Sequence, residues 1–316
     1  MNVTPGTNCH ICGGAGQGEV VDLDKPESLL GDVRNNTLNV NCNIDNKCYL
    51  FGGMTSTDTV SRNTVNVYGD GSSTNTKARV GGGGVFVSGC AEKNTVNIYK
   101  DFSCGVVVGG FVTNGTSSFN IVNVYGSITT QVDVVNISGG EVKGAGSANN
   151  NRVNISGDIQ NDGYLIIYGG NVTGAGSSAN GNSVNFSGEL KSKKGILIVG
   201  GRGADTAGNV VSISGKIGSS GGGTVTIAGS YAAKSAVNNK VIIYETAEIP
   251  DTCALYGDRL AITFSGNSLE IFFNKSLRVG RVGKFQKYQF TLGERISSEC
   301  AILSFADSGE MSRRAT

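Results

Sequence analysis

Acidic residues recur at one place in this sequence, shortly after a short stretch of alternating apolar residues. They are Asp70, Asp101, Asp158 and Glu189. Two carboxyl groups about 5 Å apart are what retaining glycoside hydrolases use as acid and nucleophile. If the chain cleaves polysaccharide, we expect Asp158 and Glu189 to be the catalytic pair. The alternative, which we favour, is that each carboxylate marks a turn where the chain meets solvent, because no row of Arg or Lys accompanies them.

The remaining inventory for catalysis is small. His10 is the only histidine, so a Ser-His-Asp or Cys-His arrangement would have to use the N-terminal segment. Cys9, His10 and Cys12 supply three potential zinc ligands, and no second CxxC or CxxH follows to complete four. P-loop, HExxH and EF-hand spacings are absent, and no helical pattern follows the GxGxxA spacing at Gly174. We therefore predict no cofactor and no metal, and we favour a non-enzymatic function.

The cysteine count bears on the compartment. Eight cysteines form an even set, which favours an oxidising environment. The closest pairs, Cys42 with Cys48 and Cys90 with Cys104, are the disulfide candidates. The alternative is that these residues are buried free thiols in glycine-rich turns.

Composition excludes several classes of function. The 316 residues carry a formal net charge of +1, so no overall field favours nucleic acid or a membrane surface. No apolar run of about 18 residues is present, so we expect no transmembrane helix. The start, MNVTPGTNCHICGG, lacks the pattern of a signal peptide, so the protein either stays inside or begins after its signal. Glycine is abundant at 49 residues beside only 3 prolines, which indicates many short strands joined by tight turns.

One short phrase repeats along the chain. It reads NTVNVYGDG from Asn63, NTVNIYKDF from Asn94, NIVNVYGSI from Asn120, NNRVNISGDI from Asn150 and NSVNFSGEL from Asn182. The apolar residue two places after the recurrent asparagine is Leu38, Val65, Val96, Val122, Val153, Val184, Val211 or Val241. These positions are 27, 31, 26, 31, 31, 27 and 30 residues apart, so a unit of about 29 residues occurs eight times. Apolar runs that end in glycine, such as YLIIYGG at 164–170, keep the same period.

The unit is too short for a propeller blade and lacks the i, i+3, i+4 pattern of helical repeats. Its apolar residues alternate, as Val153 and Ile155 do, and glycine, asparagine and serine separate the alternating stretches. Two or three short strands in about 29 residues fit one coil of a parallel β-helix, with coils about 4.8 Å apart. We predict an all-β chain: a right-handed parallel β-helix, or solenoid, of about eight coils with caps at both ends.

Three segments follow from the repeat. Residues 1–30 are expected to form an N-terminal cap, in which Asp24 begins a short helix with Pro26 in its first turn. Residues 31–257 are the β-helix repeats. Residues 258–316 still alternate, with more phenylalanine, and are expected to form a β-rich C-terminal cap with a flexible tail.

The alternation assigns the asparagines to two faces. With Val153 and Ile155 inward, Asn151 also points inward, and a buried amide is costly unless it is hydrogen-bonded. Stacked at one coil spacing, equivalent amides bond to one another, so we predict a structural ladder with no ligand role. Its members are Asn36, Asn63, Asn94, Asn120, Asn151, Asn182, Asn209 and Asn239.

A second row points outward beside a row of hydroxyl and aromatic residues. It runs Asn39, Asn66, Asn97, Asn123, Asn154, Asn185, Ser212 and Ile242, next to Tyr68, Tyr99, Tyr125, Ser156, Ser187, Ser214 and Tyr244. Amide and aromatic side chains on a flat face suit carbohydrate, and the same composition also keeps an exposed solenoid face soluble. The ligand-facing candidates are Asn97, Asn123, Asn154, Asn185, Tyr68, Tyr99 and Tyr125.

The phrases NNRVNISGDI, GGEVKGAGSANNN and YGGNVTGAGSSANGNSVNFSG resemble the passenger repeats of bacterial autotransporter-type surface proteins. The resemblance covers about residues 35–257 and is closest at 120–215. It implies export to the cell surface or secretion, a β-helical stalk, and adhesion or cell–cell association, as in virulence factors.

We therefore expect an extracellular or cell-surface β-helical adhesin or stalk module. Its expected partners are a host-cell or neighbouring-cell surface, a glycan, or further copies of the same chain, and no nucleic acid. Two alternatives stay open: a carbohydrate-active β-helix enzyme, either a polysaccharide lyase or a hydrolase, and a purely structural surface scaffold. The sequence names neither the ligand nor the disulfide pairing.

Overall fold

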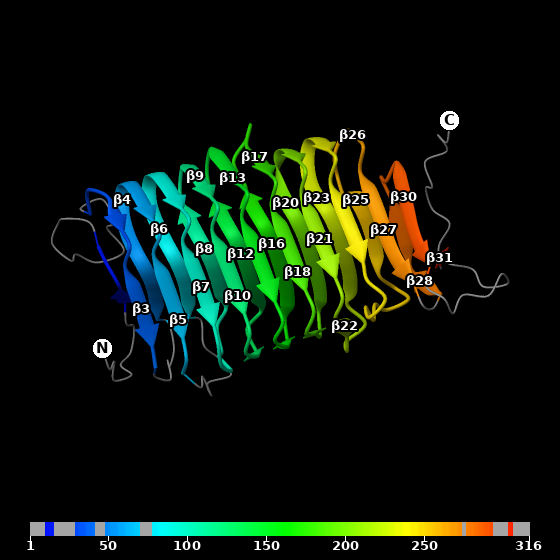
Figure 1. Cartoon of the computed structure of the whole chain (residues 1–316), viewed down its shortest axis with the longest axis horizontal. Coiled ribbons are helices and arrows are strands. Elements are labelled where there is room, and N and C mark those ends of the chain that lie inside the picture. Colours follow the sequence, from blue (N-terminus) through cyan, green and yellow to red (C-terminus); the bar gives the residue numbers. More distant parts are fainter. Residues whose placement is uncertain are drawn as a thin grey trace.

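The computed structural model describes residues 10–15, 29–41, 48–69, 78–273, 276–292 and 303–305. Over these residues the chain has strands and no helix. Parallel strands stack in about eight turns, and Figure 1 shows them as an elongated rod with β3 and β4 near one end and β30 near the other. The predicted all-β parallel β-helix is confirmed, and its right-handed sense stays a prediction. No described segment is a helix of the length and apolarity needed to cross a bilayer.

The repeated asparagine phrases form one sheet, here called the asparagine sheet. Its ten described strands, in order, are β3 (Thr37–Val40), β5 (Thr64–Val67), β7 (Thr95–Ile98), β10 (Ile121–Val124), β14 (Arg152–Ile155), β18 (Ser183–Phe186), β21 (Val210–Ile213), β24 (Lys240–Ile243), β27 (Ser268–Phe273) and β30 (Lys287–Leu292). Neighbouring strands are parallel and keep the register of the repeat, so Val153 lies between Val122 and Val184. One apolar residue per coil therefore stacks in a single buried row.

The glycine-ended apolar runs form a second sheet, here called the glycine sheet, of fifteen described strands. They are β1 (His10–Cys12), β2 (Val33–Arg34), β4 (Tyr49–Ser61), β6 (Arg79–Glu92), β8 (Val106–Val112), β9 (Gly115–Ser118), β12 (Val134–Val142), β13 (Gly146–Asn149), β16 (Tyr164–Val172), β17 (Ser178–Asn180), β20 (Gly195–Ala207), β23 (Thr224–Val237), β25 (Ala254–Asp258), β26 (Thr263–Ser265) and β29 (Arg281–Gly283). Long strands such as β6 pair with two shorter ones, β8 and β9, in the next coil. This sheet therefore continues across a corner of the coil.

A short third sheet closes part of the coil. It contains β11 (Ile128–Thr130), β15 (Ile159–Asn161), β19 (Glu189–Ser192) and β22 (Lys216–Ser219), and β28 (Leu277–Val279) pairs separately with β31 (Leu303–Phe305). The three sheets enclose one continuous apolar core that runs from Ile11 to Phe285. The alternation of the repeat supplies most of this core, because every second residue of strands such as β14 points into it. Val85 and Val142 of the glycine sheet belong to a separate, smaller apolar cluster.

The predicted inner asparagine ladder is present and continues one coil further than expected. In each coil the Nδ2 of one asparagine donates to the Oδ1 of the next, as Asn120 does to Asn151 at 3.0 Å and Asn239 does to Asn267 at 3.3 Å. The backbone N–H of Asn267 then donates to Oε1 of Gln286 at 3.0 Å, so a glutamine ends the row. Because β27 and β30 also extend the asparagine sheet, the stacking continues past residue 257.

The start of the chain differs in a similar way. Strand β1 pairs in parallel with β4, and Ala15 pairs with Met54, so residues 10–15 already belong to the stack. The expected helix at Asp24 and Pro26 and the expected C-terminal tail lie outside the described residues.

One predicted disulfide is wrong. Cys90 and Cys104 are both free thiols. Cys104 lies in the main core, whereas Cys90 lies on β6 between Thr59 and Thr116 of the adjacent coils, outside that core. Cys48 is disulfide-bonded, and Cys42 lies outside the described residues, so their pairing stays a prediction.

The free thiols are expected to differ sharply in reactivity, because the thiolate is the nucleophile. Burial raises the pKa of Cys104 to about 12 and raises that of Cys253 as well. Burial and the charge of Glu92 also raise the pKa of Cys90, but Cys90 is only half-buried, so reagent can reach it in the folded protein. We expect iodoacetamide at about pH 8 to label Cys90 in the folded protein and to reach Cys104 and Cys253 only after unfolding. Peptide mapping by mass spectrometry checks this order. A Cys90 that reacts only after reduction would contradict it and restore the disulfide.

Candidate functional site

The carboxylates of the acidic row accept hydrogen bonds from backbone N–H groups at the turns between coils. The carboxylate of Asp101 accepts a hydrogen bond from the backbone N–H of Ser127 at 3.0 Å, and that of Asp158 accepts one from the N–H of Glu189 at 2.8 Å. Asp70 lies outside the described residues. Each described aspartate of the row therefore fixes the start of the following coil, which is a structural use of the carboxylate.

Glu189, the other member of the nominated catalytic pair, is held by cations. Lys191 Nζ lies 2.7 Å from one carboxylate oxygen, and Lys216 Nζ lies 3.7 Å from the other. The hydrogen bond from Lys191 is the largest cause that lowers the pKa of Glu189 below its usual value. A general acid of a glycosidase needs a raised pKa, so Glu189 does not suit that role.

The outward asparagines form a second hydrogen-bonded row, here called the outer asparagine ladder. Its members are Asn39, Asn66, Asn97, Asn123, Asn154 and Asn185, with amide-to-amide distances of 2.8–2.9 Å. In this row each Nδ2 donates towards the preceding coil, opposite to the inner ladder. An amide has two donor hydrogens and two acceptor lone pairs, and the ladder uses one of each. The second N–H and the second lone pair of each amide are available for a ligand. They lie on a half-buried face, and the ladder bonds already fix the planes of the amides.

Aromatic rings stack beside this ladder in two blocks. The rings of Tyr68 and Tyr99 are parallel within 6°, with centroids 4.9 Å apart, and Tyr125 continues the stack at 5.3 Å. Further along, Tyr244 stacks on Phe272 at 5.2 Å. The rings lie on successive coils, so their faces look along the rod and only the end faces of each block are open to a ligand.

Between the two blocks, three coils carry serine where the coils on either side carry a ring. Ser156, Ser187 and Ser214 leave a trough of about 290 Å³, bounded by Tyr125 and Tyr244. Asn154, Asn185 and Ser212 also line it beside Ile155 and Phe186, so amides and hydroxyls lie among apolar surface. Tyr125 and Tyr244 are four coils apart, roughly 19 Å at one strand spacing per coil.

The structure thus places the predicted ligand-facing residues together on one face. Tyr68, Tyr99 and Tyr125 form the first block, while Asn154 and Asn185 reach the trough. The row expected from the sequence includes Tyr244 and omits Phe272. The register of β24 with β27 was the signal that could have found it, since Asn267 and Leu269 repeat the asparagine phrase.

Comparison with known proteins identifies no relative: no family model, curated protein or solved structure matches this chain. The class of protein therefore follows from the fold, which is that of a parallel β-helix repeat protein. Within that class the most developed surface feature of the asparagine sheet is the outer ladder with its two aromatic blocks and the trough between them.

Proposed function

We propose that this chain is a β-helical adhesin or stalk module, secreted or held at a cell surface, that binds glycans through the outer face of the asparagine sheet. One observation carries the proposal: the trough places amides and hydroxyls on a partly apolar surface, with an aromatic ring at each end. The resemblance of the repeats to autotransporter passengers supports the location.

The chemistry of the trough suits a sugar. Fixed amides and serine hydroxyls match sugar hydroxyl groups, which both donate and accept hydrogen bonds. The open faces of Tyr125 and Tyr244 offer flat apolar surfaces for the C–H faces of a pyranose, as aromatic side chains do in many ligand sites. A trough of about 290 Å³ takes only a few sugar rings. Useful adhesion would then come from many modules engaging one surface at once.

Truncation of either end ring is the direct test. We expect Tyr125→Ala and Tyr244→Ala each to weaken binding of a neutral oligosaccharide by roughly tenfold, the effect of about 1.4 kcal/mol of lost contact. The ligand would first be identified on a glycan array, and affinities then measured by calorimetry.

Tyr164→Ala is the matched control, because Tyr164 is 49% exposed, similar to Tyr125 at 51%, and lies on the glycine sheet. It should leave binding unchanged. An array with no neutral-glycan hit, or an equal loss in all three variants, would remove the trough as the site. If beads coated with the protein then still aggregate, self-association or a scaffold function takes its place.

A further inference from the structure

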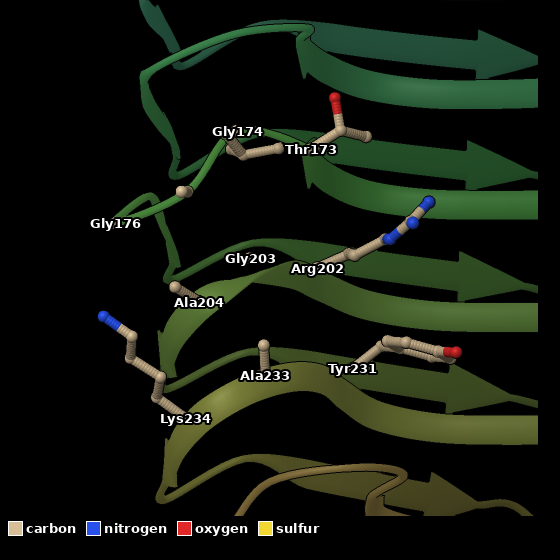
Figure 2. Close-up of a pocket in the computed structure, with 11 residues that line it drawn as sticks. Thr173, Gly174, Gly176, Arg202, Gly203, Ala204, Tyr231, Ala233 and Lys234 are labelled. Atoms are coloured by element: carbon tan, nitrogen blue, oxygen red, sulfur yellow. The ribbon is translucent and has the colours of Figure 1, made fainter.

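The glycine sheet carries a larger pocket, on a different surface from the trough. It has a volume of about 370 Å³, and Thr173, Gly176, Arg202, Tyr231 and Lys234 are among its lining residues. Figure 2 shows Arg202 and Tyr231 extending to the same side from neighbouring strands, with Lys234 on the opposite side of the pocket. No function described above uses this site.

The pocket exists because successive coils turn the corner with different numbers of residues. Six residues, 172–177, separate Asn171 from Ser178, whereas only 203 and 204 separate their partners Arg202 and Asp205. Three residues, 232–234, separate the next partners, Tyr231 and Ser235. The longer coil forms a loop beside strand β20, and that loop is one wall. Gly176 sits in it with φ of 70°, a conformation that favours glycine.

Aromatic rings hold the arginines at this site. The guanidinium carbon of Arg202 lies 5.6 Å from the ring centre of Tyr231 and 5.8 Å from that of Tyr168. Arg259, in the coil beyond, lies 5.4 Å from the same Tyr231 ring. Cation–π contacts fix the position of a guanidinium and leave its positive charge and most of its N–H donors unused.

The carboxylates of the region are committed elsewhere. Asp258 is buried and accepts hydrogen bonds from the Ser230 hydroxyl and several backbone N–H groups, and Asp205 accepts one from the Ser235 hydroxyl. Within the part of the chain that the structure describes, Arg202, Lys234 and Arg259 have no ion-pair partner. Three uncompensated positive charges thus gather here in a chain whose net charge is +1.

We propose that this pocket binds the anionic group of an acidic sugar, with Arg202 holding a carboxylate or sulfate and Lys234 adding positive charge from the opposite side of the pocket. A bare oxyanion would fill little of about 370 Å³, since a water molecule takes roughly 30 Å³. A small organic ring with one charged group fits the mixture of apolar lining and few polar groups. The choice of a sugar rests on the proposed function, whereas the anion site does not.

The test compares trigalacturonic acid with its methyl ester, which keeps the rings and removes the charges. We expect the acid to bind roughly tenfold more tightly than the ester, and salt to weaken the acid's binding. R202Q and K234Q should each remove this difference. K193Q is the matched control, because Lys193 is an exposed cation paired with Asp162 away from the pocket, and it should change nothing.

A heparin-derived disaccharide distinguishes a sulfate site from a carboxylate site. If it binds more tightly than trigalacturonic acid does, the site is assigned to sulfated sugars. Equal binding of acid and ester, with no hit for the sulfated sugar, overturns the proposal. So does undiminished binding of the anionic sugar by R202Q and K234Q. If inorganic phosphate binds as tightly as either sugar, the pocket is an anion site and the proposal that it recognises a sugar is wrong. Tyr125→Ala separates the two sites, since it should lower neutral-glycan binding only.

Discussion

Replacing Asn151 with alanine is expected to lower the free energy of unfolding by about 3–5 kcal/mol. The Asn151 side chain is 1% exposed. Its Oδ1 accepts from both the backbone N–H and the Nδ2 of Asn120, and its Nδ2 donates to Ser117 O and Asn182 Oδ1. Alanine removes all four bonds and leaves the buried N–H of Asn120 without an acceptor, which costs more than the loss of a bond exposed to water. Urea denaturation followed by circular dichroism measures the change.

Asn154→Ala is the control, because Asn154 lies three residues further along, in β14, and belongs to the outer ladder. Its amide is half-buried and makes only two ladder bonds, to Asn123 and from Asn185. Water can replace these, so we expect a loss of less than about 1 kcal/mol. Equal losses in the two variants would show that the inner ladder has no special weight in the fold.

Gly140→Ala is expected to destabilise the protein by about 3 kcal/mol or more. A Cβ at Gly140 would lie 2.5 Å from Nδ2 of Asn151 and 2.7 Å from Oγ of Ser117. Asn151 is bonded to both neighbouring coils and cannot move aside without breaking those bonds. The glycines that end the apolar runs are therefore explained by the ladder, which passes directly against them.

Gly218→Ala tests whether any glycine substitution has this effect. No heavy atom lies within 4 Å of a Cβ at Gly218, and its φ is not positive. We expect a change within about 0.5 kcal/mol of zero, because alanine also restricts the unfolded chain. A denaturation midpoint of Gly140→Ala as high as that of Gly218→Ala would contradict the steric argument.

The period of the sequence predicted the parts of this fold that repeat. Every coil must place an asparagine and two apolar residues against their copies in the next coil, so Asn151, Val153 and Ile155 were assigned to the interior from their spacing, and they lie there. The same signal extended to Asn267. The phenylalanine-rich surroundings of Asn267 differ from the other units, which hides the repeat there.

Features that depend on differences between coils could not be read in this way. Spacing along the chain does not say which way a cysteine points, so Cys90 and Cys104 were paired although one faces the core and the other does not. The pocket at Arg202 arises from unequal corner lengths, which need the strand register to be known. The trough was predictable in part. Its row of serines is visible in the sequence, but the cavity follows only from the structure, in which the rings of Tyr125 and Tyr244 end two aromatic stacks.

The orientation of the strands has a mechanical consequence. The strands lie across the rod, so the hydrogen bonds between coils run along its length, and the first and last described coils lie at opposite ends (Figure 1). Tension between the two ends would therefore pull each coil from its neighbour along its bonds, and coils would detach one after another. Each detached coil of about 29 residues would release roughly 100 Å of chain. A module anchored at one end and bound to a surface at the other would lengthen in steps under load, and each step would dissipate part of the applied work.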